Sequence, residues 1–141
     1  MKIFSLITLL SFFIVACGSN ANTANDGSNV DTEQQDQPKV KKLAQNDLQA
    51  KIAEENVVLI DVRTPGEVNA GIIKGADAFI DYNGSSFQEE IGKLDKSKTY
   101  VMYCRSGARS GRAADYMVKN GFTNVYNLQG GIMSYKGEVV N

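Results

Sequence analysis

The sequence predicts an α/β domain with a mainly parallel sheet, and three observations support this. Apolar runs typical of strands alternate with stretches of helical spacing from Val40 to Asn141. One run, Val57–Ile60, is continuously β-branched and aliphatic, as expected of a central parallel strand that is covered on both faces. A cysteine, Cys104, lies between the strand-like run Tyr100–Tyr103 and the helical stretch Ser110–Lys119. Ligands of such sheets bind beyond the carboxyl ends of the strands.

Size and composition limit the classes of protein to which the chain can belong. The 141 residues are enough for one domain with a hydrophobic core and too few for two. The net charge of −1 gives no electrostatic basis for binding nucleic acid. The chain has no histidine, and its two cysteines are too few for a zinc site or a disulfide framework. We therefore expect neither a metal nor another cofactor.

The first 16 residues predict a signal peptide. Lys2 supplies a positive charge, and the 14 residues of Ile3–Ala16 are almost wholly apolar and uncharged. This run is shorter than the ~20 residues that a membrane-spanning helix needs. The segment Ile14–Gly18, IVACG, resembles a bacterial lipobox, which implies cleavage before Cys17 and a lipid on that cysteine. An ordinary secretory peptide is the alternative; the lipobox predicts an envelope protein anchored in the membrane through Cys17, facing the periplasm or the cell exterior.

A polar segment follows. Gly18–Lys39 is rich in Asn, Ser, Thr, Asp and Gln, and Val30 is its only aliphatic residue larger than alanine. It cannot bury enough apolar surface to fold, so we expect a flexible tether that spans about 25 Å. The predicted organisation is a signal peptide at 1–16, a lipidated cysteine and disordered tether at 17–39, and a folded domain at 40–141.

The elements of the folded domain follow in order. Val40–Ala44 predicts a short edge strand. Asn46 is expected to cap a helix that runs to about Glu55. Pro65 suits the first turn of another short helix. The other predicted strands are Val57–Ile60, Ala78–Ile80, Tyr100–Tyr103 and Val125–Leu128, and the other predicted helices are Ser85–Leu94, Ser110–Lys119 and Ile132–Lys136.

The loop Arg105–Arg109 places Cys104 for reactivity. Unpaired N–H groups at the start of a helix attract anions and favour thiolate over thiol. Such cysteines have pKa values of roughly 3.5–7.5 instead of about 8.5. Backbone N–H groups of the loop are expected to curl around Sγ, and Gly107 relaxes the steric limits on so tight a curl. We therefore predict that Cys104 is a nucleophile that carries a sulfur atom.

Four stretches of the chain resemble a single rhodanese-like domain, in the order and spacing of that family. They are VVLIDVRTPGE (Val57–Glu67), GIIKGA (Gly71–Ala76), YVMYCRSGARS (Tyr100–Ser110) and GFTNVYNLQGGI (Gly121–Ile132). The resemblance implies a mainly parallel sheet of about five strands with helices on both faces. It also implies an enzyme of the thiosulfate sulfurtransferase type or a persulfide carrier, with the sulfur held on Cys104.

The chemistry that the resemblance implies fits the residues present. Transfer of a sulfane sulfur needs an activated thiol and stabilisation of negative charge, and its leaving groups need little protonation. Arg105 and Arg109 are candidate cations for a small anionic donor such as thiosulfate, and the acceptor would be a thiol or cyanide. The predicted substrate-binding residues are Arg105, Ser106, Gly107, Ala108 and Arg109. The predicted supporting residues are Asp61, Arg63 and Ser110.

Several of these residues have plainer interpretations. Cys104 can be an apolar core residue, as free cysteines often are. Arg109 can be the structural partner of a carboxylate such as Asp61. Asp61 is expected to brace the loop rather than to touch substrate, and Arg63 either forms an ion pair or lines the pocket. Ser110 either donates a hydrogen bond to the sulfur or caps the following helix.

Two other functions remain open. One is a phosphatase or arsenate reductase: phosphatases that resemble this fold have five residues between the cysteine and the arginine of their loop, whereas Cys104 and Arg109 enclose four. The shorter loop suits sulfur better than a tetrahedral phosphate. Alternatively, the domain is a persulfide carrier or redox-linked binding module at the envelope, loaded and unloaded by a partner such as an envelope redox protein. The sequence does not separate carrier from enzyme, because both need the same loop.

Overall fold

The computed structural model describes residues 38–141, so the predicted signal peptide, Cys17 and nearly all of the tether lie outside the described residues. The described part contains a five-stranded sheet in the order β1-β6-β5-β2-β4, with every neighbouring pair parallel. This confirms the predicted α/β architecture. The strands are β1 (Lys41–Leu43), β2 (Val57–Asp61), β4 (Ala78–Phe79), β5 (Thr99–Tyr103) and β6 (Val125–Leu128).

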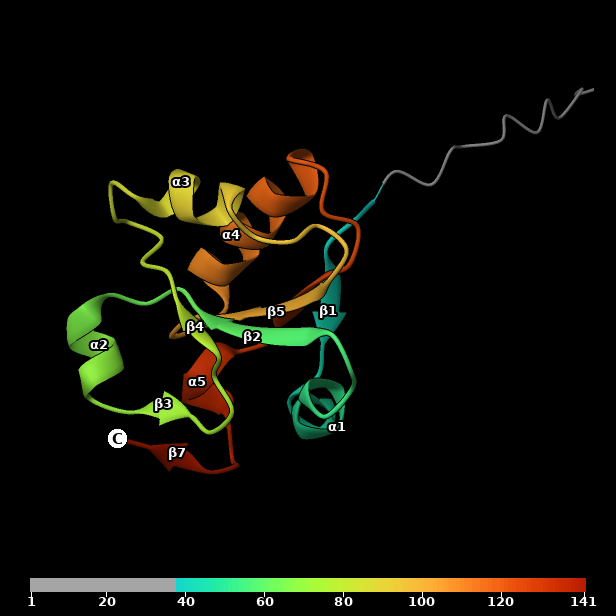
Figure 1. Cartoon of the computed structure of the whole chain (residues 1–141). Coiled ribbons are helices and arrows are strands. Elements are labelled where there is room, and N and C mark those ends of the chain that lie inside the picture. The colour runs from blue at the N-terminus through green and yellow to red at the C-terminus, as the bar shows by residue number, and fades with distance from the viewer. Residues whose placement is uncertain (1–37) are drawn as a thin grey trace, which may run out of the picture. The chain divides into compact units, whose positions relative to one another are not determined.

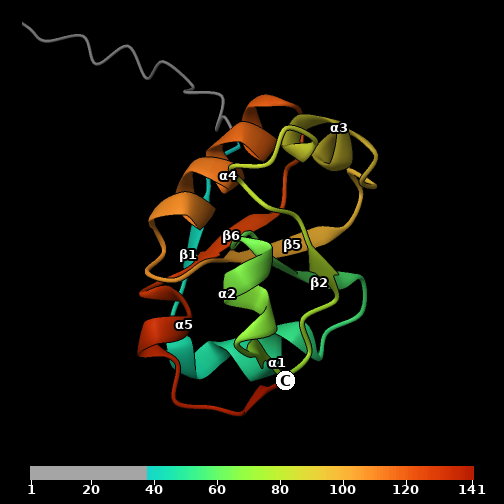
Figure 2. The same ribbon diagram turned by 90° about the vertical axis from the view of Figure 1, so that its left-hand side faces the viewer.

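Helices cover both faces of the sheet, as predicted (Figure 1). On one face lie α3 (Phe87–Gly92) and α4 (Ala108–Lys119), and on the other lie α1 (Leu48–Ile52) and α5 (Gly131–Ser134). The short helix α2 (Pro65–Asn69) follows β2 and lies nearest the viewer in Figure 2. Within residues 38–141, no helix is both long and apolar enough to cross a membrane.

The two central strands explain why the core has two halves. Successive side chains of a strand point to opposite faces of its sheet. Ile60 and Met102 belong to the apolar cluster under α3 and α4, whereas Leu59 and Val101 belong to the cluster under α1 and α5. All four are fully buried. The continuous apolar run in β2 therefore reflects burial on both faces, as expected of a parallel strand.

Some element boundaries differ from the predictions. Asn46 is not a helix cap: it lies inside a 3-10 turn, η1 (Gln45–Asp47), and the first residue of α1 is Leu48. Helix α4 begins at Ala108, two residues earlier than predicted, because Gly107 has a φ of 94° and turns the chain into the helix. A small antiparallel pair, β3 (Ile72–Ile73) with β7 (Val139–Val140), was not predicted. Each of its strands has only two residues, too few for a periodic signal.

Candidate active site

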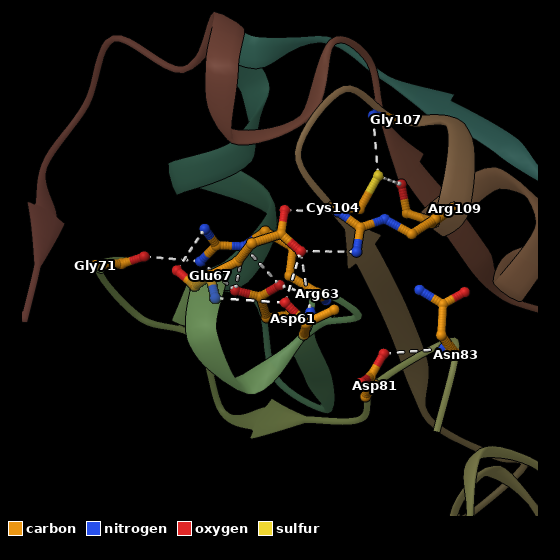
Figure 3. A network of polar contacts seen from close by, with 11 residues as sticks. Asp61, Arg63, Glu67, Gly71, Asp81, Asn83, Cys104, Gly107 and Arg109 are labelled. Carbon is orange, nitrogen blue, oxygen red and sulfur yellow. Dashed lines mark hydrogen bonds and ion pairs between the residues drawn. The ribbon is translucent and has the colours of Figure 1, made fainter. Parts of the chain in front are cut away.

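Cys104 lies at the edge of the sheet where the parallel strands end. It follows β5 directly, and the neighbouring strand β2 ends in register with it, since Asp61 pairs with Tyr103. Strand β4 ends at the same edge, where Phe79 pairs with Asp61. The close view in Figure 3 shows that Cys104 shares this edge with charged side chains from the segments that follow β2 and β4. This is the position at which open α/β sheets bind ligands.

The loop after Cys104 directs backbone N–H groups at the sulfur. The N–H of Gly107 donates to Sγ at 3.1 Å (Figure 3), and the nearby N–H groups of Ser106 and Ser110 also act to lower the pKa of the thiol. Gly107 takes the left-handed conformation that ends this curl, which L side chains adopt only with strain. The structure therefore has the converging amides predicted from the sequence.

The carbonyl groups of the same loop are held by the start of α5. The N–H of Ile132 donates to the Cys104 carbonyl at 2.9 Å, and the N–H of Met133 donates to the Arg105 carbonyl at 3.0 Å. The chain can approach this closely because residue 131 is glycine: its φ is 55°, and a Cβ there would overlap the Cys104 carbonyl oxygen. With the carbonyls fixed on this side, the N–H groups of the loop face the sulfur.

Opposing effects act on the pKa of Cys104. The residue is only 1% exposed, and burial raises the pKa of a thiol. Hydrogen bonds to the sulfur from the Ser110 hydroxyl and from the N–H groups of Ser110, Ser106 and Gly107 outweigh burial, so that the pKa lies below its usual value. Burial alone, as in an apolar core residue, would have the opposite result. The site therefore favours the thiolate.

Arg109 is bound by a carboxylate other than the one suggested by the sequence. Its guanidinium donates to both oxygens of Glu67, at 2.8 and 2.7 Å, and Asp61 is not its partner. Glu67 also accepts hydrogen bonds from the N–H and hydroxyl of Thr64, completing the capping box of α2. The pair thus joins the start of α4 to α2, and Arg109 is held beside the sulfur with its charge already neutralised.

Asp61 and Arg63 form a second, more deeply buried pair. The guanidinium of Arg63 donates to both carboxylate oxygens of Asp61, and it also donates to the carbonyls of Glu67 and Gly71. Both side chains are at most 6% exposed. Both roles open for Arg63 are seen, because it forms this ion pair and also lines a pocket with Pro65, Val68, Asn69, Phe79 and Asp81. Asp61 was expected to brace the cysteine loop. Its carboxylate accepts hydrogen bonds from Arg63 and also interacts with the phenol of Tyr103, the residue before Cys104. Through Arg63, the pair also holds the segment between β2 and β3.

The remaining loop residues are accessible. Arg105, Ser106 and Ala108 are exposed. Within residues 38–141, the exposed Arg105 guanidinium has no hydrogen bond or ion pair to another side chain, so no carboxylate neutralises its charge. Ser110 is buried in the first turn of α4 and does not cap it, since the N-cap residue is Gly107. The described residues hold no cluster of three or more metal-binding side chains.

Two residues near Cys104 were missed in the sequence. Glu67 had a visible signal, because Thr64 and Glu67 have the spacing of a capping box. Asn127 is the other: its side chain bonds both the Ser110 hydroxyl and the Gly107 carbonyl. The sequence indicates Asn127 only weakly, since it is a single polar amide residue inside the strand Val125–Leu128.

The Glu67–Arg109 pair predicts a pH-dependent loss of stability in Glu67→Gln. The hydrogen bond from Arg109 is the main cause that lowers the pKa of Glu67 from 4.5 to about 2. A lowered pKa stabilises the folded state fully above 4.5, and this contribution is lost as the pH falls through about 2. Glutamine keeps the capping box. Allowing for partial exposure, we expect Glu67→Gln to lower the free energy of unfolding by about 1–2 kcal/mol at pH 7.

Urea titrations between pH 2 and pH 7 would measure this difference. It should shrink steadily below pH 4.5 and vanish near pH 2. Glu138→Gln is the matched control, because Glu138 forms an exposed pair with Lys74 and should change stability little at any pH. Equal effects of the two substitutions at pH 7 would contradict the assignment.

Comparisons with known proteins agree with this arrangement. A family model described as the rhodanese-like domain matches residues 44–138. The chain is 39% identical over 100 residues to YtwF of Bacillus subtilis, a protein named provisionally as a sulfurtransferase; the match covers 70% of this chain and 93% of that protein. It is 34% identical over 97 residues to a sulfurtransferase of Allochromatium vinosum, covering 68% of this chain and 88% of the relative.

Solved structures show the same fold. A rhodanese-related protein from Thermoplasma volcanium superposes with a TM-score of 0.62 at 28% identity, covering 71% of this chain and 97% of that one. A rhodanese-like domain protein from Staphylococcus aureus gives a TM-score of 0.60 at 25% identity, covering 72% and 100%. The family match extends from the residue after β1 almost to β7 and includes the whole cysteine loop, so this chain belongs to the rhodanese-like domain family.

Proposed function

We propose that this chain is a sulfurtransferase that moves a sulfane sulfur from an anionic donor such as thiosulfate to a thiophilic acceptor through a persulfide on Cys104. The observation that carries the proposal is the convergence of backbone N–H groups on Sγ, which stabilises negative charge at the sulfur. Membership of the rhodanese-like family, with relatives named as sulfurtransferases, supports the same reaction class.

The reaction needs two displacements at sulfur. The Cys104 thiolate attacks the outer sulfur of thiosulfate, forming a new S–S bond while the old S–S bond breaks and sulfite leaves with the electron pair. An acceptor such as cyanide or a thiolate then attacks the outer sulfur of the persulfide, and the Cys104 thiolate leaves. Neither leaving group needs a proton, which suits a chain without histidine.

The arginines of the loop are suited to different tasks. Arg109 is committed to Glu67, so we assign it a positioning role at the start of α4. Arg105 is exposed and directly follows the nucleophile, so we assign it to the sulfonate end of the donor. The cysteine is 1% exposed, and this enclosure favours donors and acceptors as small as thiosulfate and cyanide.

The direct test is the intact mass of the protein after incubation with thiosulfate. We expect a gain of one sulfur atom that cyanide removes, because cyanide takes the outer sulfur as thiocyanate. Cys104→Ser should show no gain. A wild-type protein that stays unmodified while hydrolysing an aryl phosphate would overturn the proposal and favour the phosphatase alternative.

Steady-state kinetics then separate an enzyme from a carrier. Continuous formation of thiocyanate from thiosulfate and cyanide would support the enzyme. A stable persulfide with negligible turnover would contradict it and favour a carrier that needs a protein partner.

Arg105→Ala tests the binding of the donor. Loss of one charge-assisted contact corresponds to about a tenfold increase in KM for thiosulfate, with a smaller change in kcat. Arg112→Ala is the matched control, because Arg112 is an exposed arginine further along α4. If both variants raise KM equally, the effect comes from the general charge of the domain, and the assignment of Arg105 is wrong.

We further propose that the chain is held at the cell envelope by a lipid on Cys17. The uncharged apolar segment Ile3–Ala16 followed by Cys17 in a lipobox-like context supports this. Expressed in a bacterium fed labelled palmitate, the full chain should incorporate label and sediment with membranes. Cys17→Ser should incorporate none, whereas Cys104→Ser should behave as wild type. Secretion of unlabelled wild-type protein would instead indicate an ordinary signal peptide.

A further inference from the structure

The side chain of Asn127 links the nucleophile's neighbours in an unusual way. Asn127 lies on β6, opposite Met102 of β5, and its amide reaches over to the start of α4. Its Nδ2 group donates to the Gly107 carbonyl at 3.0 Å. Its Oδ1 lies 2.7 Å from the Ser110 hydroxyl, and that hydroxyl lies 3.5 Å from Sγ of Cys104. Neither step of the sulfur transfer involves this amide.

The donors and acceptors in this network are fixed by chemistry. A carbonyl oxygen can only accept, so the NH₂ group of Asn127 must face Gly107, and Oδ1 must face Ser110. Oδ1 can also only accept, so the bond between Ser110 and Asn127 uses the hydroxyl hydrogen. A serine hydroxyl has one hydrogen. While that hydrogen points at Asn127, Ser110 presents only a lone pair to the sulfur.

We propose that Asn127 competes with the Cys104 sulfur for the single hydrogen of the Ser110 hydroxyl, and so sets how strongly Ser110 stabilises the anionic sulfur. Asn127 is thus a positioning residue that acts through Ser110. The inference deepens the proposed function, because it concerns the same cysteine. It does not need sulfur transfer for its test, so either can fail without the other.

The two protonation states of the cysteine use the network differently. In the thiol form, S–H donates to Ser110, Ser110 donates to Asn127, Asn127 donates to the Gly107 carbonyl, and the Gly107 N–H donates to the sulfur, which closes a ring of hydrogen bonds. In the thiolate form, the Ser110 hydrogen can turn to the sulfur only by leaving Oδ1 of Asn127. Asn127 therefore favours the thiol and opposes the effect of the loop amides.

A glycine in α4 makes room for this amide. Gly111 lies inside the helix, where glycine costs about 1 kcal/mol relative to alanine. A Cβ at this position would lie 3.1 Å from Nδ2 of Asn127, closer than ordinary contact. The helix therefore carries an unfavourable residue at the point where the Asn127 side chain packs.

Charged groups around the cysteine act independently of Asn127. Arg109 interacts with the charge of Cys104, and Glu67 and Asp81 act in turn on Arg109. The other charged groups at this edge of the sheet are Arg105 in the loop and the pair Asp61 and Arg63 after β2. None of these side chains is hydrogen-bonded to Asn127, so a substitution of Asn127 leaves their electrostatic effect on Cys104 unchanged.

The experiment measures the rate of alkylation of Cys104 by iodoacetamide against pH, on the full chain with Cys17 replaced by serine so that Cys104 is its one thiol. The midpoint of the curve of rate against pH reports the ionisation of Cys104. We expect this midpoint to rise by about 1 pH unit in Ser110→Ala, which removes the hydroxyl donor. We expect it to fall by about 0.5–1 unit in Asn127→Leu, which releases that donor. In the double variant the midpoint should match Ser110→Ala alone.

If Asn127 only held the loop in place, Asn127→Leu would change the midpoint whether or not Ser110 were present. Opposite shifts in the two single variants, with no effect of Asn127→Leu in the Ser110→Ala background, indicate competition for the hydroxyl hydrogen. An unchanged or raised midpoint in Asn127→Leu overturns the proposal, and so does a fall that persists in the Ser110→Ala background. Asn120→Leu is the matched control: Asn120 lies at the other end of α4, and its substitution should leave the midpoint unchanged.

A second measurement needs no substitution at Asn127 and covers the case in which Asn127→Leu does not fold. In the otherwise native domain, the side-chain carbonyl carbon of Asn127 should shift in the NMR spectrum with the same midpoint as alkylation, because Oδ1 loses its donor when the thiolate forms. The shift should be absent in Cys104→Ala, and Asn120 should show none. An Asn127 signal that does not follow the thiol overturns the proposal.

Discussion

The activated cysteine depends on how the start of α5 holds the loop that follows β5. Two N–H groups of α5 bind the carbonyls of Cys104 and Arg105, so the loop cannot turn these carbonyls toward the sulfur. Gly131 permits the contact, since a Cβ there would lie only 2.4 Å from the Cys104 carbonyl oxygen. The N–H groups are then left to face Sγ, which lowers the pKa of the thiol despite its burial. A short helix thus fixes the orientation of the peptide groups that act on the sulfur.

The charged side chains around this loop divide into anchored and free groups. Arg63 and Arg109 are each bound by a carboxylate, which fixes the end of β2 and the start of α4 relative to α2. A guanidinium held in this way keeps its position but offers little net charge to a ligand. Arg105 alone among the three has no such partner in residues 38–141, and it adjoins the nucleophile. The site therefore combines two anchored arginines with a third, Arg105, whose charge no described side chain neutralises.

The sequence predicted those features that are encoded locally. The parallel strands and the cysteine loop could be recognised, because apolar runs and the residues CRSGARS are contiguous. Side-chain partners that are brought together only by the tertiary structure were harder to predict from the sequence. Glu67 lies 42 residues before Arg109, and only the packing of α2 beside α4 selects it over Asp61. Asn127 reaches Ser110 through the register of β6 on β5, which no local pattern specifies. Asn46 is an example of a local pattern that misled the prediction. Asparagine is a favourable helix cap, but here it lies inside a 3-10 turn.

The dependence of the loop on α5 has a consequence for the newly made chain. Ile132 and Met133 come 28 and 29 residues after Cys104, so their amides reach the loop only once this later stretch of the chain has been synthesised. Until then, the cysteine is an ordinary thiol that is largely protonated at neutral pH. Activation of the thiol therefore waits until α5 packs against the loop, and an unfolded polypeptide carries a sulfhydryl of low nucleophilicity.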